Sequence, residues 1–183
     1  DLYTPWMSEH LTQIDVAAVR TDTPAVEQII HLNNCGTSLP PQPVMDAMID
    51  YLQLEASVGG YEAMDVGEAG LDRVYTAGAE LLGCGRDEVA FTTGASEAWW
   101  RAFLSVPLQA GDRVLIGRTE YIANALALLQ VAERGVAVEV VPDDADGQID
   151  LDALQTMLDE RVKLVCLTSI AMTNGLVNPT PKV

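Results

Sequence analysis

One short run of small and hydroxyl-bearing residues has the composition of an anion-binding turn. The run FTTGASE (Phe91 to Glu97) joins an apolar stretch, Val89 to Thr92, to a helical pattern that begins at Ser96. At such a junction the first N–H groups of the helix have no partner within the helix, and the helix dipole favours negative charge. Gly94 would let the backbone approach a ligand closely, and the hydroxyls of Thr93 and Ser96 are further donors. The run therefore predicts a phosphate site.

Helix capping explains the same residues in another way. Thr93 or Gly94 would then be the N-cap, and Glu97, three residues after Gly94, would complete a capping arrangement. The spacing alone favours helix capping, because lone turns of Gly, Ser and Thr are common.

The elements that must position this turn follow an alternating pattern. From about residue 86 onward, β-rich runs alternate with helical patterns, which is typical of parallel strands joined by crossover helices. The fold class predicted is α/β. The expected strands are Val89 to Thr92, Arg113 to Gly117, Val136 to Val141 and Val162 to Leu167. The expected helices are Ser96 to Leu108, Tyr121 to Glu133 and Leu151 to Asp159.

The first third of the chain is more helical. We expect one brief strand, Ile29 to Leu32, then a loop over residues 33–38 and a helix that Pro40 and Pro41 open and that runs to about Leu54. A long helical pattern, Tyr61 to Leu82, follows a Gly-Gly break. Three glycines that disfavour a helix interior interrupt this pattern: Gly67, Gly70 and Gly78.

Composition excludes several classes of partner. The 183 residues leave room for one core, and the net charge of -17 disfavours nucleic acid and anionic membrane surfaces. There is no apolar run of about 18 residues and no secretory signal at the start, so a soluble protein is expected. Three well-separated cysteines predict a reducing, cytoplasmic location, and two isolated histidines predict no metal site. Neither GxGxxG nor GxxxxGK[ST] occurs, which disfavours a nucleotide-binding domain.

Four segments resemble one enzyme family. FTTGASEA is similar to the FTSGATEA segment of class V aminotransferases, the pyridoxal-phosphate (PLP) enzymes of fold type I that include cysteine desulfurases and isopenicillin N epimerase-like proteins. The other matching segments, in the same order as in the family, are His31 to Pro41, Gly111 to Leu126 and Lys163 to Pro179. The GGYEA run at residues 59–63 and the form TNGLVNP resemble the branch that includes hercynylcysteine sulfoxide lyase and related C–S lyases.

The resemblance implies a three-layer sandwich around a mainly parallel sheet, the large domain of a fold type I PLP-dependent transferase. Residues 1–40 would be an N-terminal segment, and residues 41–183 the N-terminal part of the PLP-binding large domain. Because only a short tail follows the GLVNP run, we expect the chain to be part of a longer polypeptide or one of two pieces. The family also implies a homodimer with the cofactor pocket near the subunit boundary.

The family pattern also assigns cofactor contacts. It implies that the backbone of Gly94 and Ala95 and the hydroxyl of Ser96 hold the PLP phosphate, with Thr93 beside them. Tyr121 occupies the place of the desulfurase histidine that stacks on the pyridine ring, and its aromatic face can serve the same purpose. The alternative for Tyr121 is the surface-exposed start of an amphipathic helix.

Other family positions match less closely. Thr173 and Asn174 are the remaining polar candidates to contact the pyridoxal oxygen, although loop capping also accounts for them. Asn34 and Thr37 match the family's loop near the substrate, and an Asx turn is the alternative there.

Two groups that PLP chemistry needs do not match any residue of this chain. These are the Schiff-base lysine and the aspartate that keeps the ring nitrogen protonated. Neither Lys163 nor Lys182 lies in the family's lysine motif, so the catalytic residue is unknown. Cys35, Cys84 and Cys166 are expected to be small buried residues, since nothing basic lies beside them.

The resemblance implies an enzyme that binds a small amino acid as an external aldimine and cleaves the C–S bond of a cysteine derivative, as a lyase or desulfurase does. Alternatives are a class V epimerase or aminotransferase and, in a different class, a truncated non-catalytic homologue that serves dimerisation or binding.

Overall fold

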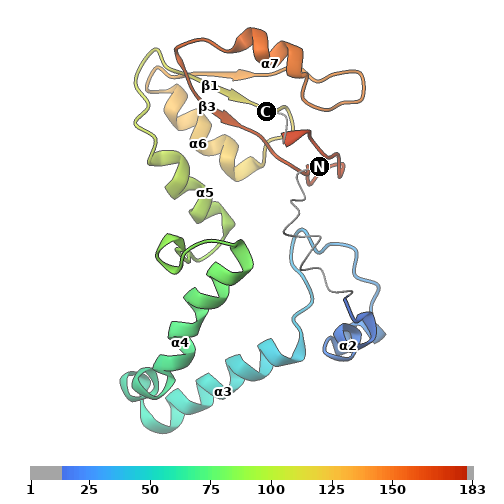
Figure 1. Cartoon of the computed structure of the whole chain (residues 1–183), viewed down its shortest axis with the longest axis vertical. Coiled ribbons are helices and arrows are strands. Elements are labelled where there is room, and N and C mark those ends of the chain that lie inside the picture. Colours follow the sequence, from blue (N-terminus) through green and yellow to red (C-terminus); the bar gives the residue numbers. More distant parts are fainter. Residues whose placement is uncertain (1–13, 181–183) are drawn as a thin grey trace. The chain divides into compact units, whose positions relative to one another are not determined.

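The computed structural model describes residues 14–180, which form two compact units, residues 14–90 and residues 91–180 (Figure 1). The first unit is helical. Its elements are α2 (Val16–Thr21), the 3-10 helix η1 (Pro24–Glu27), α3 (Gln42–Val58), α4 (Gly60–Leu82) and the 3-10 helix η2 (Arg86–Glu88).

The two long helices of the first unit pack against each other. They meet at Gly59, whose φ of 98° lies in the region that favours glycine. Packing between the two helices favours glycine at position 67, because a Cβ there would lie 2.9 Å from Cε2 of Tyr51 on α3. The three glycines that disfavour a helix interior therefore do not interrupt α4, which runs unbroken through them.

The prediction of a strand at Ile29 to Leu32 is wrong. This segment has no regular secondary structure, and Ile30 and Leu32 are each 89% exposed. An extended apolar run forms a strand only when another strand lies beside it to take its hydrogen bonds, and none does here among residues 14–180.

The second unit is an α/β layer structure. Its elements in chain order are α5 (Ala95–Leu104), β1 (Arg113–Ile116), α6 (Ile122–Ala132), β2 (Ala137–Val140), α7 (Leu151–Met157) and β3 (Val162–Cys166). The three strands are parallel in the order β2-β1-β3. Six expected elements are confirmed with ends that shift by a few residues, and so is the predicted α/β class.

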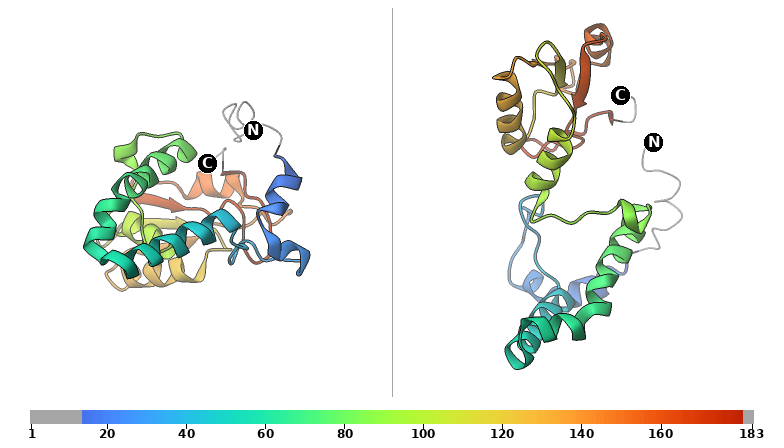
Figure 2. Two further views of the ribbon diagram at one scale, coloured as in Figure 1. Left: turned by 90° about the horizontal axis from the view of Figure 1, so that it is seen from below. Right: turned by 90° about the vertical axis from the view of Figure 1, so that its left-hand side faces the viewer.

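Successive side chains of β1 point to opposite faces of the sheet, and each face carries a hydrophobic core. Val114 packs with Phe103 of α5 and Leu128 of α6, whereas Leu115 packs with Leu154 of α7. Figures 1 and 2 show α6 on one side of the strands and α7 on the other. Because successive side chains of a strand point to opposite faces, the apolar run in β1 requires helices on both sides.

The strand predicted at Val89 to Thr92 is also wrong. Residues 89–92 have no regular secondary structure and pair with none of the three strands. The α5 helix therefore follows an irregular segment, and its N-terminus is defined by Gly94 rather than by a preceding strand.

No helix within residues 14–180 is long and apolar enough to cross a membrane.

Candidate functional site

The predicted cofactor contacts of the second unit belong to the edge at which its strands end. Tyr121 follows β1, and Thr173 and Asn174 follow β3. The middle of α5 contacts the start of α6, where Trp100 Nε1 donates to the carbonyl of Ala123 over 2.8 Å. Because the C-terminus of α5 leads to the beginning of β1, its N-terminus points toward the carboxyl edge. Ligands of open α/β sheets bind at this carboxyl edge.

Gly94 is the N-cap of α5, and nothing within residues 14–180 requires glycine there. Its φ of 174° and ψ of 169° are extended values that any residue adopts. A Cβ added at Gly94 would meet no atom within 4 Å. The open space above this backbone is what the close approach of a ligand needs.

The donors beside Gly94 have no recorded partner in the part of the chain that the structure describes. Within residues 14–180 no acceptor is recorded for the backbone N–H groups of Ala95 and Ser96 or for the Ser96 hydroxyl, and both residues are exposed. These are the groups that a helix N-terminus offers to an anion. The geometry suits a phosphate.

Thr93 is engaged differently. Its hydroxyl and its backbone N–H donate to Glu97 Oε2 over 2.6 and 3.1 Å, and Arg101 Nε donates to Glu97 Oε1 over 2.8 Å. The Thr93 hydroxyl, followed by Arg101, lowers the pKa of Glu97 to about 2, so that this carboxylate is ionised near neutral pH. The capping interpretation therefore describes Thr93 and Glu97, while the anion-binding interpretation remains open for the residues from Gly94 to Ser96.

Tyr121 stands immediately before α6, and its side chain is 43% exposed. Its backbone N–H donates to Glu120 Oε1 over 2.8 Å. The same oxygen accepts from Nδ2 of Asn124 over 2.9 Å and from the Thr168 hydroxyl over 3.5 Å. One carboxylate thus connects the loop after β1, the first turn of α6 and the loop after β3.

Thr173 and Asn174 form the tip of a turn. The turn is closed by the bond from Gly175 N to the Ala171 carbonyl over 2.8 Å and by an antiparallel bridge between Ile170 and Val177. Asn174 Oδ1 accepts from the Leu176 N–H over 3.0 Å, which is the loop capping considered for it. Both residues are exposed.

Asn34 and Thr37 belong to the other unit, in the loop before α3. The N–H of Thr37 donates to the Asn33 carbonyl over 3.2 Å, and the Thr37 carbonyl lies 2.7 Å from His31 Nε2. Asn34 lines an open hollow with Arg20 and His31. Residues 34–36 form a turn that backbone bonds to the Asn33 carbonyl close, and no Asx bond from a backbone N–H to the side chain of Asn33 or Asn34 is recorded within residues 14–180.

Sequence reasoning missed Glu120, Thr168 and Asn178 as parts of this edge. The buried side chain of Asn178 donates from Nδ2 to the Thr168 carbonyl over 2.8 Å and accepts at Oδ1 from the Ile149 N–H over 2.9 Å. It therefore ties the loop after β3 to the loop after β2. Glu120 and Asn178 lie in two of the matched segments, which was the available signal.

Within residues 14–180, the side chains of Lys163 and the three cysteines take no part in the recorded hydrogen bonds at the carboxyl edge. Lys163 is the second residue of β3, toward the opposite edge of the sheet, and its Nζ donates to the Glu160 carbonyl over 2.7 Å. Lys182 lies outside the described residues. Cys166 is buried as predicted, and burial, followed by the charge of Glu120, raises its pKa to about 11. The prediction of burial is wrong for Cys35 and Cys84, which are exposed.

Comparison with known proteins places the chain in a family. The family described as Aminotransferase class-V matches residues 30–183. The chain belongs to this family. It is similar to a probable cysteine desulfurase of Halobacterium salinarum, with 32% identity over 91% of this chain and 44% of that protein. A probable cysteine desulfurase of Methanothermobacter thermautotrophicus is 29% identical over 90% of this chain and 42% of that protein. The chain thus spans under half the length of these relatives.

Solved structures share the fold. The apo cysteine desulfurase of Thermococcus onnurineus NA1 matches with a TM-score of 0.77 and 24% identity over 90% of this chain and 42% of that chain. A mutant of C-DES, with glycine covalently linked to its PLP cofactor, matches with a TM-score of 0.79 and 18% identity over 87% of this chain and 43% of that chain. The predicted fold type I architecture, a parallel sheet between helices, is confirmed.

Proposed function

We propose that this chain supplies the phosphate-holding part of a PLP-dependent enzyme that cleaves the C–S bond of a cysteine derivative. The observation that carries the proposal is the N-terminus of α5, where Gly94 is open and the amides of Ala95 and Ser96 are unpaired within the described chain. Family membership supports the choice of PLP, because a neighbour with the same fold holds that cofactor.

The residues present fit the cofactor's phosphate. A dianion at the start of α5 would receive hydrogen bonds from the amides of Ala95 and Ser96 and from the Ser96 hydroxyl, with the helix dipole adding to the attraction. Tyr121, on the same edge, offers an exposed aromatic ring to the pyridine. Thr93 would contribute through its place beside Gly94, since its own donors are taken by Glu97.

PLP supplies an electron sink that stabilises negative charge at the Cα of an amino acid. The described chain contributes binding and orientation to that chemistry. Lys163 lies toward the opposite edge of the sheet, and neither it nor Lys182 lies in the family's lysine motif, so the Schiff-base lysine would come from sequence outside these 183 residues. Thr173 and Asn174, at the carboxyl edge, and Asn34 and Thr37, in the N-terminal unit, are proposed to contact cofactor and substrate respectively.

The choice of C–S cleavage follows the relatives. Several are cysteine desulfurases, and C-DES is described as a cystine C–S lyase. A desulfurase transfers sulfur from cysteine to an acceptor thiol and leaves alanine, whereas a lyase consumes water and releases a thiol, pyruvate and ammonia. Product analysis of the full polypeptide incubated with cysteine and with cysteine conjugates distinguishes the two. Racemised or transaminated substrate, with no sulfur released, would contradict C–S cleavage.

Phosphate binding has its own test, independent of turnover. Pyridoxine 5′-phosphate carries no aldehyde and cannot form an imine, so calorimetry measures its non-covalent affinity, and comparison with pyridoxine reports the contribution of the phosphate. We expect pyridoxine 5′-phosphate to bind more tightly than pyridoxine. Gly94→Ala should weaken this binding about tenfold by placing a methyl group where the phosphate approaches.

Gly70→Ala is the matched control, since a Cβ at that position of α4 also meets no atom within 4 Å. It should leave the affinity unchanged. Equal affinity for pyridoxine and its phosphate, or equal effects of the two substitutions, would refute a phosphate site at the N-terminus of α5.

A further inference from the structure

The Glu120 carboxylate is a junction at the carboxyl edge of the sheet. Its Oε1 accepts from the Tyr121 N–H, from Asn124 Nδ2 and from the Thr168 hydroxyl, at 2.8, 2.9 and 3.5 Å. Glu120 is only partly exposed, and a charge in such a place is retained when several donors surround it. These three donors come from two loops and one helix.

These contacts fix the geometry around Tyr121. The bond to its own N–H holds the backbone at φ −70° and ψ 139°, the extended conformation from which α6 starts. The bond from Asn124, one turn into α6, holds the helix against the same oxygen. Glu120 therefore restrains the backbone that carries the Tyr121 ring through two hydrogen bonds, one from Tyr121 itself and one from Asn124.

The same carboxylate orients the amide of Asn124. Because Nδ2 is committed to Glu120, the amide cannot flip without losing that bond, and its Oδ1 is left as an acceptor with no partner recorded within residues 14–180. Through Thr168 the restraint continues to Asn178, which binds the loop after β2. The polar chain thus spans the ends of all three strands.

We propose that Glu120 is the positioning residue of the cofactor site, which holds the Tyr121 ring and the Asn124 amide in the orientation that a pyridine ring requires. This inference rests on the proposed function. A simpler role, an acidic residue that stabilises the N-terminus of α6, accounts for the bond to Tyr121 N–H but not for those to Asn124 and Thr168.

The test separates ring binding from phosphate binding. Affinities of the full chain are measured for pyridoxine 5′-phosphate and for inorganic phosphate, and their ratio reports what the ring contributes. In Glu120→Ala we expect this ratio to fall about three- to tenfold, the range of a lost aromatic contact, while the affinity for inorganic phosphate is unchanged. Glu120→Gln keeps an acceptor oxygen and should restore part of the ratio.

Amide NMR gives a second readout that does not depend on a ligand. The Tyr121 backbone N–H and the Asn124 side-chain N–H resonances should shift in Glu120→Ala and shift less in Glu120→Gln. The control is Glu133→Ala, a change at an exposed acid at the other end of α6, which should move neither the resonances nor the ratio.

The failures are distinguishable. If the wild-type chain binds pyridoxine and pyridoxine 5′-phosphate equally, the proposed function and this inference both fall. If it binds pyridoxine 5′-phosphate no more tightly than inorganic phosphate, only this inference falls. If the wild type prefers pyridoxine 5′-phosphate and Gly94→Ala weakens it, but Glu120→Ala and Glu120→Gln keep the wild-type ratio, only the inference is overturned. Equal losses for both ligands would assign Glu120 a general structural role and overturn it as well.

Discussion

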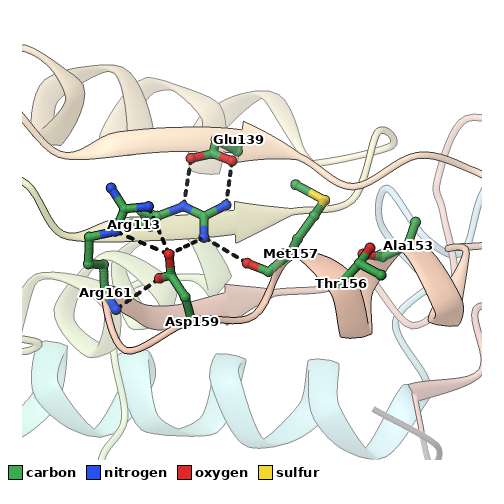
Figure 3. A network of polar contacts seen from close by, with 7 residues as sticks. All are labelled: Arg113, Glu139, Ala153, Thr156, Met157, Asp159 and Arg161. Atoms are coloured by element: carbon green, nitrogen blue, oxygen red, sulfur yellow. Dashed lines mark hydrogen bonds and ion pairs between the residues drawn. The ribbon is translucent and has the colours of Figure 1, made fainter.

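Arg113 and Glu139 form a two-pronged ion pair between neighbouring strands. Nε and Nη2 of Arg113 donate to the two carboxylate oxygens of Glu139 over 2.7 and 2.6 Å, as Figure 3 shows. Nη1 of Arg113 also donates to the Met157 carbonyl over 2.7 Å and lies 3.1 Å from Asp159 Oδ2. One guanidinium thus joins β1, β2, the end of α7 and the segment before β3.

Replacing Arg113 should destabilise the sheet. The residue is 8% exposed, and Arg113→Met would leave two carboxylates and a carbonyl without their shared donor. We expect the thermal midpoint, followed by circular dichroism, to fall by several degrees in Arg113→Met. The midpoint of Arg113→Lys should fall less, because lysine keeps the charge although it lacks the paired donors of the guanidinium. Arg134→Met, at an exposed position, is the control. Equal midpoints for the two Met variants would contradict a stabilising role.

Acid should weaken the same cluster. Hydrogen bonds from Arg161, then from Arg113, lower the pKa of Asp159 to about 2, and Arg113 lowers that of Glu139. A carboxyl whose folded pKa is depressed contributes stability above its unfolded pKa, near 4, and that stability is lost as the pH falls toward the folded value. Urea midpoints should therefore decline between about pH 4 and pH 2.

Asp159→Asn isolates that acid dependence. The variant should be less stable than the wild type at neutral pH and should decline less steeply below about pH 4. Asp146→Asn, in an exposed turn, should keep the wild-type slope. Parallel profiles for Asp159→Asn and the wild type would show that another carboxyl is responsible.

The sequence predicted elements whose signal is local. Apolar residues at helical spacing predict the helix over Tyr121 to Glu133, and a continuous apolar run predicts the strand over Val162 to Leu167; both elements form. The strands at residues 29–32 and 89–92 were predicted wrongly from equally apolar runs, since a strand also needs a partner strand that no local pattern reveals.

The candidate site was only partly predictable for a related reason. The run around Gly94 carries its own signal, because the donors of a helix N-terminus are consecutive residues. Glu120, Thr168 and Asn178 come together only when three strands end at one edge, and the contact between Arg113 and Asp159 likewise spans 46 positions of sequence. Such contacts follow from topology, which spacing alone does not give.

The central strand should be intolerant of cavities. Leu115 is fully buried and packs with Val141, Ile149 and Leu154 beneath α7. Leu115→Ala should reduce the free energy of unfolding by about 2 to 5 kcal/mol in urea titrations. Leu129→Ala, at a position of α6 that is 64% exposed, should cost far less. Similar losses at the two positions would contradict the assignment of Leu115 to the core.

Thr93 and Ser96 should differ in their effect on phosphate binding, although both carry hydroxyls beside Gly94. The Thr93 hydroxyl is used by Glu97, whereas that of Ser96 has no recorded partner in the described chain. Ser96→Ala should weaken binding of pyridoxine 5′-phosphate about tenfold, and Thr93→Val by no more than about twofold. Calorimetric titration measures both. The reverse order would mean that Thr93 leaves Glu97 to bind the ligand.

The negative charge of Glu97 should lower the affinity of the α5 N-terminus for a phosphate. With a pKa of about 2 it carries a full negative charge at neutral pH, three residues from Gly94 and at the end of the helix where a phosphate would bind. Glu97→Gln keeps an oxygen that can accept from Thr93 but removes the repulsion, so the affinity for pyridoxine 5′-phosphate should rise and the gain should shrink as salt is added. Glu133→Gln, at the far end of α6, controls for the change in net charge. A lower affinity in Glu97→Gln would show instead that the ion pair with Arg101 holds the start of α5 in its binding conformation.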